Sequence, residues 1–214
     1  MKESRLSHYP LDEEAPLHHT KLLYLQGGAF STTVSVSDVT NALGDIGDTA
    51  NALKSTTLQD DAKAKAAQQT PILELKKEAW YKRNLAAASH SGEPVAQVSG
   101  PLLELGHWKL AFPPESPHSS HDIDLRPTGM GQRADFFVKD SVLYFWDMPD
   151  AGRLCQLFKV VGDKRREIAR FVGKRSRLST DKSGVLLLDE EQADEVVVVL
   201  TCVAVLNRSD SFRK

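Results

Sequence analysis

The stretch that decides the fold is DEVVVVLTCVAVLNRSD, residues 194–210, close to the end of this chain of 214 residues. Its eleven apolar or near-apolar residues, Val196 to Leu206, lie between an acidic segment and a polar one. As a helix, this run would span about 16 Å, roughly half of the ~30 Å of hydrocarbon that a membrane-crossing helix has to cover. A membrane anchor is therefore rejected, and a buried strand or a core helix remains.

Both remaining structures have support in the sequence. Four consecutive valines, 196–199, favour a strand, because β-branched side chains pack well on a pleated sheet. In favour of a helix, the run is apolar on every side and longer than a typical strand. The acids that precede it and Arg208 after it also suit the two ends of a helix dipole. A helix that is hydrophobic all round has to be enclosed by the rest of the fold.

Upstream of this run, short β-type segments recur at a spacing of about ten residues, separated by turn residues. Such spacing predicts an antiparallel sandwich or barrel, and the lack of β–α–β alternation argues against a nucleotide-binding parallel sheet. Strands are expected at Ile72–Trp80, Asn84–Ser89, Val95–Val98, 107–112, Ala134–Val138, Val142–Trp146, Leu154–Val160, Arg166–Val172 and Val185–Leu188, with two more between Leu22 and Val36.

The chain divides into five expected regions. Residues 1–20 are polar and predicted to be a disordered tail, and residues 21–37 to be the first barrel strands. Residues 38–70 are expected to be a low-complexity insertion or mobile linker, since residues 59–71 (QDDAKAKAAQQTP) offer no apolar face to bury. Residues 71–208 form the predicted barrel domain, and residues 209–214 a short tail.

Composition excludes several classes of protein. A net charge of −2 excludes a polycation that coats nucleic acid through charge alone, and no RNA-binding motif is present. The N-terminal segment has no apolar run of signal-peptide length, so an intracellular, cytoplasmic location is expected. Cys155 and Cys202 lie in apolar surroundings, which favours reduced, buried thiols. Trp80, Trp108 and Trp146 are expected in the core or the barrel wall.

Three segments of the C-terminal half, in this order, resemble the tubby C-terminal-like superfamily: residues 135–150 (DFFVKDSVLYFWDMPD), 154–175 (LCQLFKVVGDKRREIARFVGKR) and 183–208 (SGVLLLDEEQADEVVVVLTCVAVLNR). They are most similar to a fungal group of small proteins, in a superfamily that includes the LURP-one-related proteins and the phospholipid scramblases. The resemblance covers roughly residues 72–208, possibly with Leu22–Val36 as first strands. It implies a mainly β fold, in which a closed antiparallel barrel of about twelve strands surrounds a buried C-terminal helix. Residues 194–206 are then that central helix.

The strongest charge feature is the segment Lys159–Lys182, with a local charge of +6. Because Arg and Lys bind phosphate, and because tubby domains bind phosphoinositides, the resemblance implies an anionic phospholipid headgroup as the ligand. The alternative is that these are solvated turns, and that the two loops emerge at opposite ends of the barrel. The candidate binding residues are Lys164, Arg165, Arg166, Lys174, Arg175 and Arg177.

Residues 118–124 (HSSHDID) contain the residue types of a metal site or a Ser-His-Asp site. His118, His121, Asp122 and Asp124 crowd one Pro- and Ser-rich loop, and neither a positioned nucleophile nor an oxyanion hole is visible, so a polar loop is predicted. No catalytic residue, metal or cofactor is expected. The leading function is a non-enzymatic binding or adaptor module, peripheral at an anionic membrane. The alternatives are a protein-interaction module without a lipid ligand and, more distantly, a hydrolase using the 113–124 loop.

Overall fold

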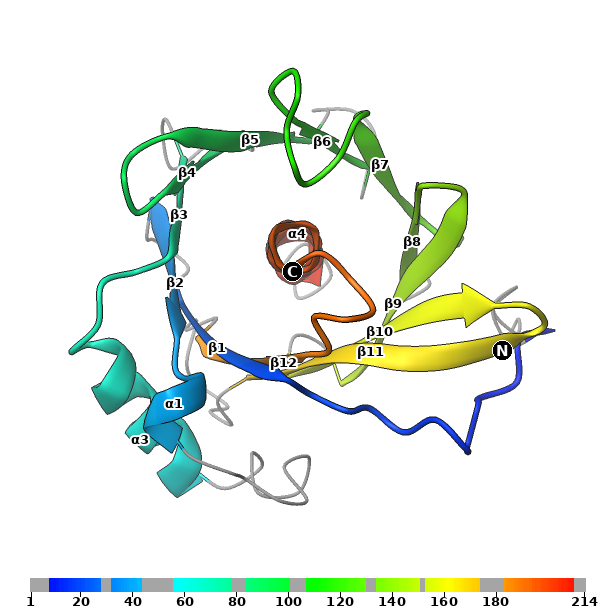
Figure 1. Cartoon of the computed structure of the whole chain (residues 1–214), viewed down its shortest axis with the longest axis horizontal. Helices are drawn as coiled ribbons and strands as arrows, with labels where there is room; N and C mark the ends of the chain where they lie inside the picture. The colour runs from blue at the N-terminus through cyan, green and yellow to red at the C-terminus, as the bar shows by residue number, and fades with distance from the viewer. Residues whose placement is uncertain are drawn as a thin grey trace.

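The computed structural model describes residues 8–27, 32–43, 56–77, 84–100, 107–129, 134–150, 153–173 and 183–209, and these form a closed antiparallel β-barrel (Figure 1). Each strand pairs with its neighbours in sequence, and the last strand closes the barrel against the first. The predicted fold class is confirmed. The twelve described strands are β1 (Lys21–Gln26), β2 (Thr33–Asp38), β3 (Leu73–Lys77), β4 (Leu85–Ser89), β5 (Pro94–Ser99), β6 (Trp108–Ala111), β7 (Ile123–Pro127), β8 (Ala134–Lys139), β9 (Val142–Asp150), β10 (Leu154–Val161), β11 (Lys164–Gly173) and β12 (Gly184–Leu188).

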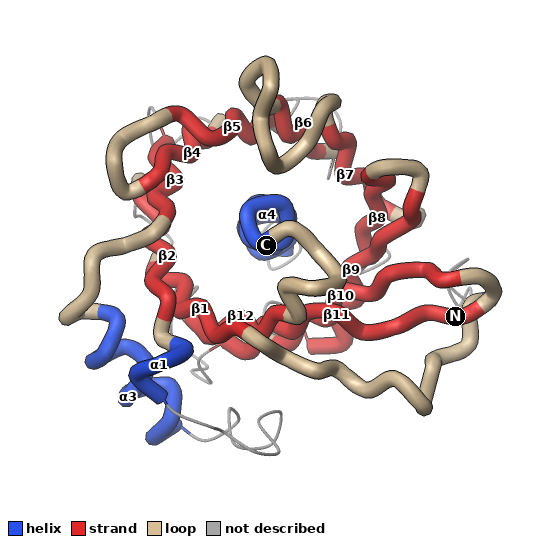
Figure 2. The backbone as a smooth tube through the Cα atoms, viewed as in Figure 1, coloured by secondary structure: helices blue, strands red, loops and turns tan. Residues whose placement is uncertain are grey.

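The apolar C-terminal run forms helix α4 (Glu195–Ser209), which lies inside the barrel (Figures 1 and 2). A closed barrel has no free edge at which a further strand could pair. A segment inside it must therefore satisfy its backbone hydrogen bonds within itself, and a helix does this. The four valines consequently adopt a helix against their intrinsic preference, and Val197, Val198 and Val199 are at most 2% exposed.

Inward-facing side chains of the strands pack around this helix and form the main core. Alternation is clear in β6 and β7, where Trp108, Leu110, Ile123 and Leu125 point inward and are buried. Trp146 is completely buried, and its indole Nε1 donates a hydrogen bond to Thr201 Oγ1 of α4 at 3.0 Å. The predicted core role of the tryptophans is confirmed for these two, whereas Trp80 lies outside the described residues.

The prediction that residues 118–124 form only a loop is wrong at its end, because β7 begins at Ile123. Ile123 and Leu125 face the core, while Asp124 and Arg126 point outward and form an ion pair at 2.9 Å. Only two apolar positions mark this strand, and Pro127 ends it, so its alternating pattern is too short to stand out.

A second layer covers the outer surface of β1 and β12. It consists of the short helix α1 (Thr40–Leu43) and helix α3 (Thr56–Ala66), whose Ala62 and Ala66 are buried against that surface. The Gln59 side chain donates a hydrogen bond to the Gly173 carbonyl oxygen at 3.2 Å. The interpretation that residues 59–71 have no face to bury is therefore wrong, because small alanine side chains allow the helix to approach the sheet closely.

Residues 8–20 differ from the disordered tail predicted for residues 1–20, of which residues 1–7 lie outside the described part. They run beside β11, where the Arg165 amide donates to the Pro10 carbonyl and the Asp12 amide donates to the Arg165 carbonyl, both at 2.9 Å. The Thr20 amide then donates to the Leu188 carbonyl of β12 at 2.8 Å. Backbone pairing, which composition does not reveal, holds this segment.

Gly184 of β12 pairs with Gly173 of β11 at a position without room for a side chain, and Gly184→Ala is expected to lower the free energy of unfolding by about 1–3 kcal/mol. An added Cβ would lie 2.5 Å from the Val172 carbonyl oxygen and 2.6 Å from the Phe171 ring. Urea unfolding measures the change. Gly100→Ala is the control, because its methyl group meets the Trp108 side chain at 3.2 Å and needs a smaller adjustment. Equal stability of Gly184→Ala and wild type would contradict the close approach.

Candidate binding site

An open pocket of about 280 Å³ lies at the end of the barrel where α4 begins, and we call it the mouth pocket. Strands β8, β9 and β10 form one side, the first turn of α4 forms another, and the loop between β12 and α4 forms a third. Its lining residues are Phe137, Lys139, Tyr144, Leu157, Glu190, Glu191, Gln192, Ala193, Asp194, Val197 and Val198.

The loop that leads from β12 into the lumen is held by its own hydrogen bonds. The buried Asp189 accepts from the Glu191 amide through Oδ1 at 3.2 Å and from the Gln192 amide through its carbonyl oxygen at 3.1 Å. Asp194 then caps the helix, since its Oδ1 accepts from the Val197 amide at 3.0 Å. The polar side of the mouth pocket is therefore a structured loop attached to a helix start.

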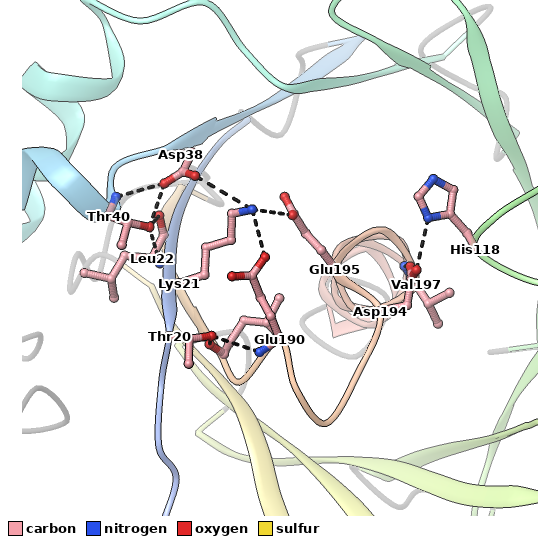
Figure 3. Close-up of polar contacts among 11 residues, drawn as sticks. Thr20, Lys21, Leu22, Asp38, Thr40, His118, Glu190, Asp194, Glu195 and Val197 are labelled. Atoms are coloured by element: carbon pink, nitrogen blue, oxygen red, sulfur yellow. Dashed lines mark hydrogen bonds and ion pairs between the residues drawn. The ribbon is translucent and has the colours of Figure 1, made fainter.

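Lys21 connects four parts of the molecule at this end (Figure 3). Its Nζ lies 2.6 Å from Glu195 Oε2, 3.0 Å from Glu190 Oε1 and 3.8 Å from Asp38 Oδ2. Burial alone lowers the pKa of Lys21, but the hydrogen bonds to Glu195 and Glu190 outweigh it and raise the pKa above its usual value. A charged Lys21 on β1 thus holds β2, the loop and the helix together.

Lys21→Met is expected to reduce the free energy of unfolding by about 1–2 kcal/mol near neutral pH, because it leaves Glu190 and Glu195 without their cation. The pKa of Lys21 is higher in the folded than in the unfolded state. Its contribution is therefore complete below the ordinary value of 10.5 and is lost as the pH rises above it. Urea unfolding of both proteins at several pH values tests this. If the difference in unfolding free energy between the two proteins grew above pH 10.5, the raised pKa of Lys21 in the folded state would be contradicted.

His118, His121, Asp122 and Asp124, the candidates for a metal or catalytic site, make separate contacts. His118 Nδ1 lies 3.0 Å from Asp194 Oδ2 and so contacts the residue that caps α4 (Figure 3). His121 contacts Ser120, and Asp122 pairs with Lys109 at 2.7 Å. For Asp124, burial raises the pKa, but the hydrogen bonds to Arg126 and His107 outweigh it and lower the pKa. Among the described residues, no group of three His, Cys, Asp or Glu side chains is arranged to hold a metal ion.

Three of the six predicted basic residues are described, and each of them has a partner within the chain. Lys164 Nζ lies 3.5 Å from Asp12 Oδ1, and the Arg166 guanidinium lies 3.7 Å from Asp189 Oδ2. The Arg165 guanidinium lies over the Phe158 ring, 4.9 Å from its centroid. Contacts with the N-terminal segment and the loop, which are distant in sequence, were not visible from the basic pattern itself.

The other three, Lys174, Arg175 and Arg177, lie outside the described residues. Gly173, after which they follow, is at the opposite end of β11 from Lys164. Lys164, Arg165 and Arg166 therefore lie about 20 Å or more from Gly173 along this strand of ten residues.

Charges around the mouth pocket are predominantly negative. Three carboxylates and one lysine line the pocket: Glu190, Glu191, Asp194 and Lys139. The direct partners of the lining residues add Lys21, His118, Asp140 and Lys159, and Lys21 also holds Asp38 and Glu195. Sequence reasoning used the acids before the apolar run only as a helix signal. Their gathering beside an aromatic wall depends on the barrel closing around the helix.

Two further sequence expectations bear on the kind of protein this is. Neither Cys155 nor Cys202 forms a disulfide bond, and both are buried. Burial, together with the neighbouring Cys155, raises the pKa of the Cys202 thiol. Over the residues that the structure describes, no helix combines the length and apolarity required to cross a bilayer.

Comparison with known proteins gives a likeness in fold. No protein-family model matches this chain, and no curated protein matches it. A protein from Arabidopsis thaliana, AT5G01750, known from its X-ray structure, is similar to it with a TM-score of 0.50 and 10% sequence identity. The alignment covers 95% of this chain and 99% of that one. At this identity, the likeness shows that the two chains share a fold along nearly their whole lengths.

Proposed function

We propose that this chain is a tubby C-terminal-like protein, closest to the fungal group, and that it is a non-enzymatic binding module whose ligand is another protein. The family assignment is supported by the architecture. The three segments that carry the resemblance correspond to β8 and β9, to β10 and β11, and to β12 with α4, and the last of these supplies the helix inside the barrel.

Binding rather than catalysis is supported by how the polar groups at the mouth are used. Lys21 holds Glu195 and Glu190, and His118 contacts the capping residue Asp194, so these groups stabilise the start of α4. A catalytic site needs a nucleophile or an acid–base pair aimed at free space. In the described part of the chain, no serine hydroxyl contacts the His118 ring, so the hydrolase alternative would depend on His121, whose Nδ1 lies 3.4 Å from Ser120 Oγ at an exposed position.

The choice of a protein over a membrane rests on one observation, the excess of three carboxylates over one lysine among the residues that line the mouth pocket. An anionic membrane surface attracts basic segments and repels acidic ones. The described basic residues Lys164, Arg165 and Arg166 are also engaged within the chain. An acidic rim around an apolar pocket suits a basic protein surface instead.

An anionic phospholipid headgroup is the second candidate ligand. It is favoured by the local charge of +6 between Lys159 and Lys182, which includes Lys174, Arg175 and Arg177. Such a ligand would be held by arginine and lysine side chains that contact its phosphate.

Vesicle co-sedimentation at physiological salt separates the two ligands. It compares neutral vesicles with vesicles containing phosphatidylserine or phosphoinositides, for wild type, Arg165→Glu/Arg166→Glu and the control Lys63→Glu/Lys65→Glu, whose lysines are exposed on α3. We expect no preference for anionic vesicles. Sedimentation with anionic vesicles alone, lost in the arginine variant and kept in the control, would establish the lipid ligand instead.

Site-specific photo-crosslinking in cells that make the protein tests for a protein ligand directly. A photo-reactive residue at position 191 probes the mouth, one at position 63 probes α3, and one at position 93 probes a distant turn; all three positions are exposed. We expect a discrete protein adduct at position 191 and none at position 93. Without an adduct at any of the three positions, the proposed protein ligand would be wrong.

A further inference from the structure

We infer that the mouth pocket accommodates the side chain of a lysine or arginine that projects from the protein ligand. This inference rests on the proposed function and adds the chemistry of the contact. Three properties of the pocket carry it: its size, its apolar walls and the charge of its rim.

Size and shape suit one long side chain. The mouth pocket has a volume of about 280 Å³, below the roughly 300–1,000 Å³ typical of sites that enclose a whole drug-sized molecule. The pocket is open at the end of the barrel, so a side chain can enter while its backbone stays outside. A single residue of a partner therefore fits this site better than a free small molecule.

Its walls are apolar where the stem of such a side chain would lie. Phe137 and Tyr144 stack on each other from β8 and β9, with ring centroids 5.0 Å apart, and Leu157 continues this wall on β10. Val197 and Val198 of α4 form the facing side. Lysine and arginine bury their methylene stems against such surfaces while the charged head stays in a polar environment. Either cation is also attracted to an aromatic ring face.

One carboxylate on the rim is available for that charged head. Glu190 is bound to Lys21, and Asp194 is held by His118 and by the helix that it caps. Glu191 lines the pocket, is exposed, and has no ionic or hydrogen-bond partner for its carboxylate among the described residues. With three carboxylates and one lysine among the lining residues, a cation is favoured over an anion there.

The start of α4 does not reverse this preference. Helix N-termini attract anions because their first amide groups lack partners. Here the Val197 amide donates to Asp194 Oδ1, the Val198 amide donates to the Asp194 carbonyl oxygen, and Glu195 adds a negative charge in the first turn. The positive end of the helix is therefore already occupied by the chain's own acids.

The test is an NMR titration of the full-length 15N-labelled protein with Nα-acetyl-lysine methylamide. We expect saturable shifts of the amides of residues 190–194, Val197 and Val198. Two probes of similar shape serve as ligand controls: the Nε-acetylated lysine derivative, which lacks the charge, and the norleucine derivative, which keeps only the apolar stem. Both are expected to shift these amides far less at equal concentration.

Variants locate the contact. Glu191→Lys is expected to weaken binding of the lysine probe about tenfold, because the rim charge is reversed at the free carboxylate. Glu191→Gln should have a smaller effect, and Glu93→Lys, which makes the same charge change at an exposed distant turn, should have none. Equal shifts with the acetylated probe, shifts confined to other surfaces, or no shifts up to the solubility limit would each overturn the inference.

The experiments give different results if the lysine pocket is wrong and if the proposed protein ligand is wrong. A discrete adduct at position 63 with no lysine-probe binding would remove the lysine pocket and keep a protein ligand. Sedimentation with anionic vesicles that depends on Arg165 and Arg166 would remove the protein ligand as well.

Discussion

Ending the chain after Asp194 is expected to give an unfolded or aggregated product. The truncation removes all of α4, including seven valine or leucine side chains that are at most 4% exposed: Val197, Val198, Val199, Leu200, Val203, Val205 and Leu206. At about 1.5–3 kcal/mol for each buried side chain, their loss amounts to roughly 10 kcal/mol or more, which is comparable to the whole stability of a typical domain. The barrel lumen would also lose the α4 side chains that pack against its inward-facing residues.

Circular dichroism, size-exclusion chromatography and urea unfolding measure the outcome. The control ends the chain after Ser209, which keeps α4 complete and should unfold cooperatively like the wild type. Leu200→Ala gives a graded version of the same test, since this fully buried side chain should contribute about 2–5 kcal/mol. A monomeric, cooperatively folded product of the truncation after Asp194 would show that the barrel does not need its helix.

The main architecture was predictable because its signals are strong and local. The strands from β8 to β12 carry apolar and β-branched residues between compact turns, and they were predicted to within a few residues of their ends. Periodicity alone left Val196–Leu206 as either a strand or a helix. The resemblance to barrels with a central helix decided this, and the closed topology explains it, because only a helix satisfies its own backbone inside a barrel.

What could not be predicted depends on contacts between distant segments. Ala62 on α3 is buried against the outer surface of β1 and β12. An alanine- and lysine-rich sequence does not indicate that the helix packs against such a surface. Likewise, the basic pattern at Lys164–Arg166 predicted a free phosphate site. The structure gives Lys164 and Arg166 the acidic partners Asp12 and Asp189.

The mouth pocket could not be predicted from the sequence for the same reason, because its lining residues are distant in sequence. Glu191 and Tyr144 are 47 positions apart in the sequence and line one pocket only because α4 enters the barrel beside β9. A linear pattern search finds sites whose residues are close in sequence, such as 118–124, and in this chain that cluster is divided among separate contacts. The pocket follows from topology, and topology was the part of the prediction that came from resemblance.

The ion pair between Arg208 and Asp135 joins the last turn of α4 to β8, and Arg208→Met is expected to cost about 3–5 kcal/mol of unfolding free energy. Both side chains are at most 5% exposed, and burial lowers the pKa of Arg208. Removing the guanidinium leaves the Asp135 carboxylate charged or protonated in a site shielded from water, and the desolvation of that group dominates the loss.

A double-mutant cycle separates this penalty from the value of the pair itself. Arg208→Met/Asp135→Leu removes both charges, so it should be more stable than Arg208→Met and close to wild type, because a buried ion pair contributes little beyond the desolvation that it offsets. Urea unfolding of the four proteins gives the coupling free energy. Arg126→Met is the matched control: its partner Asp124 is exposed, and the change should be about 1 kcal/mol or less. If Arg208→Met were as mild as Arg126→Met, water would have to reach Asp135, and the helix end would not be sealed inside the barrel.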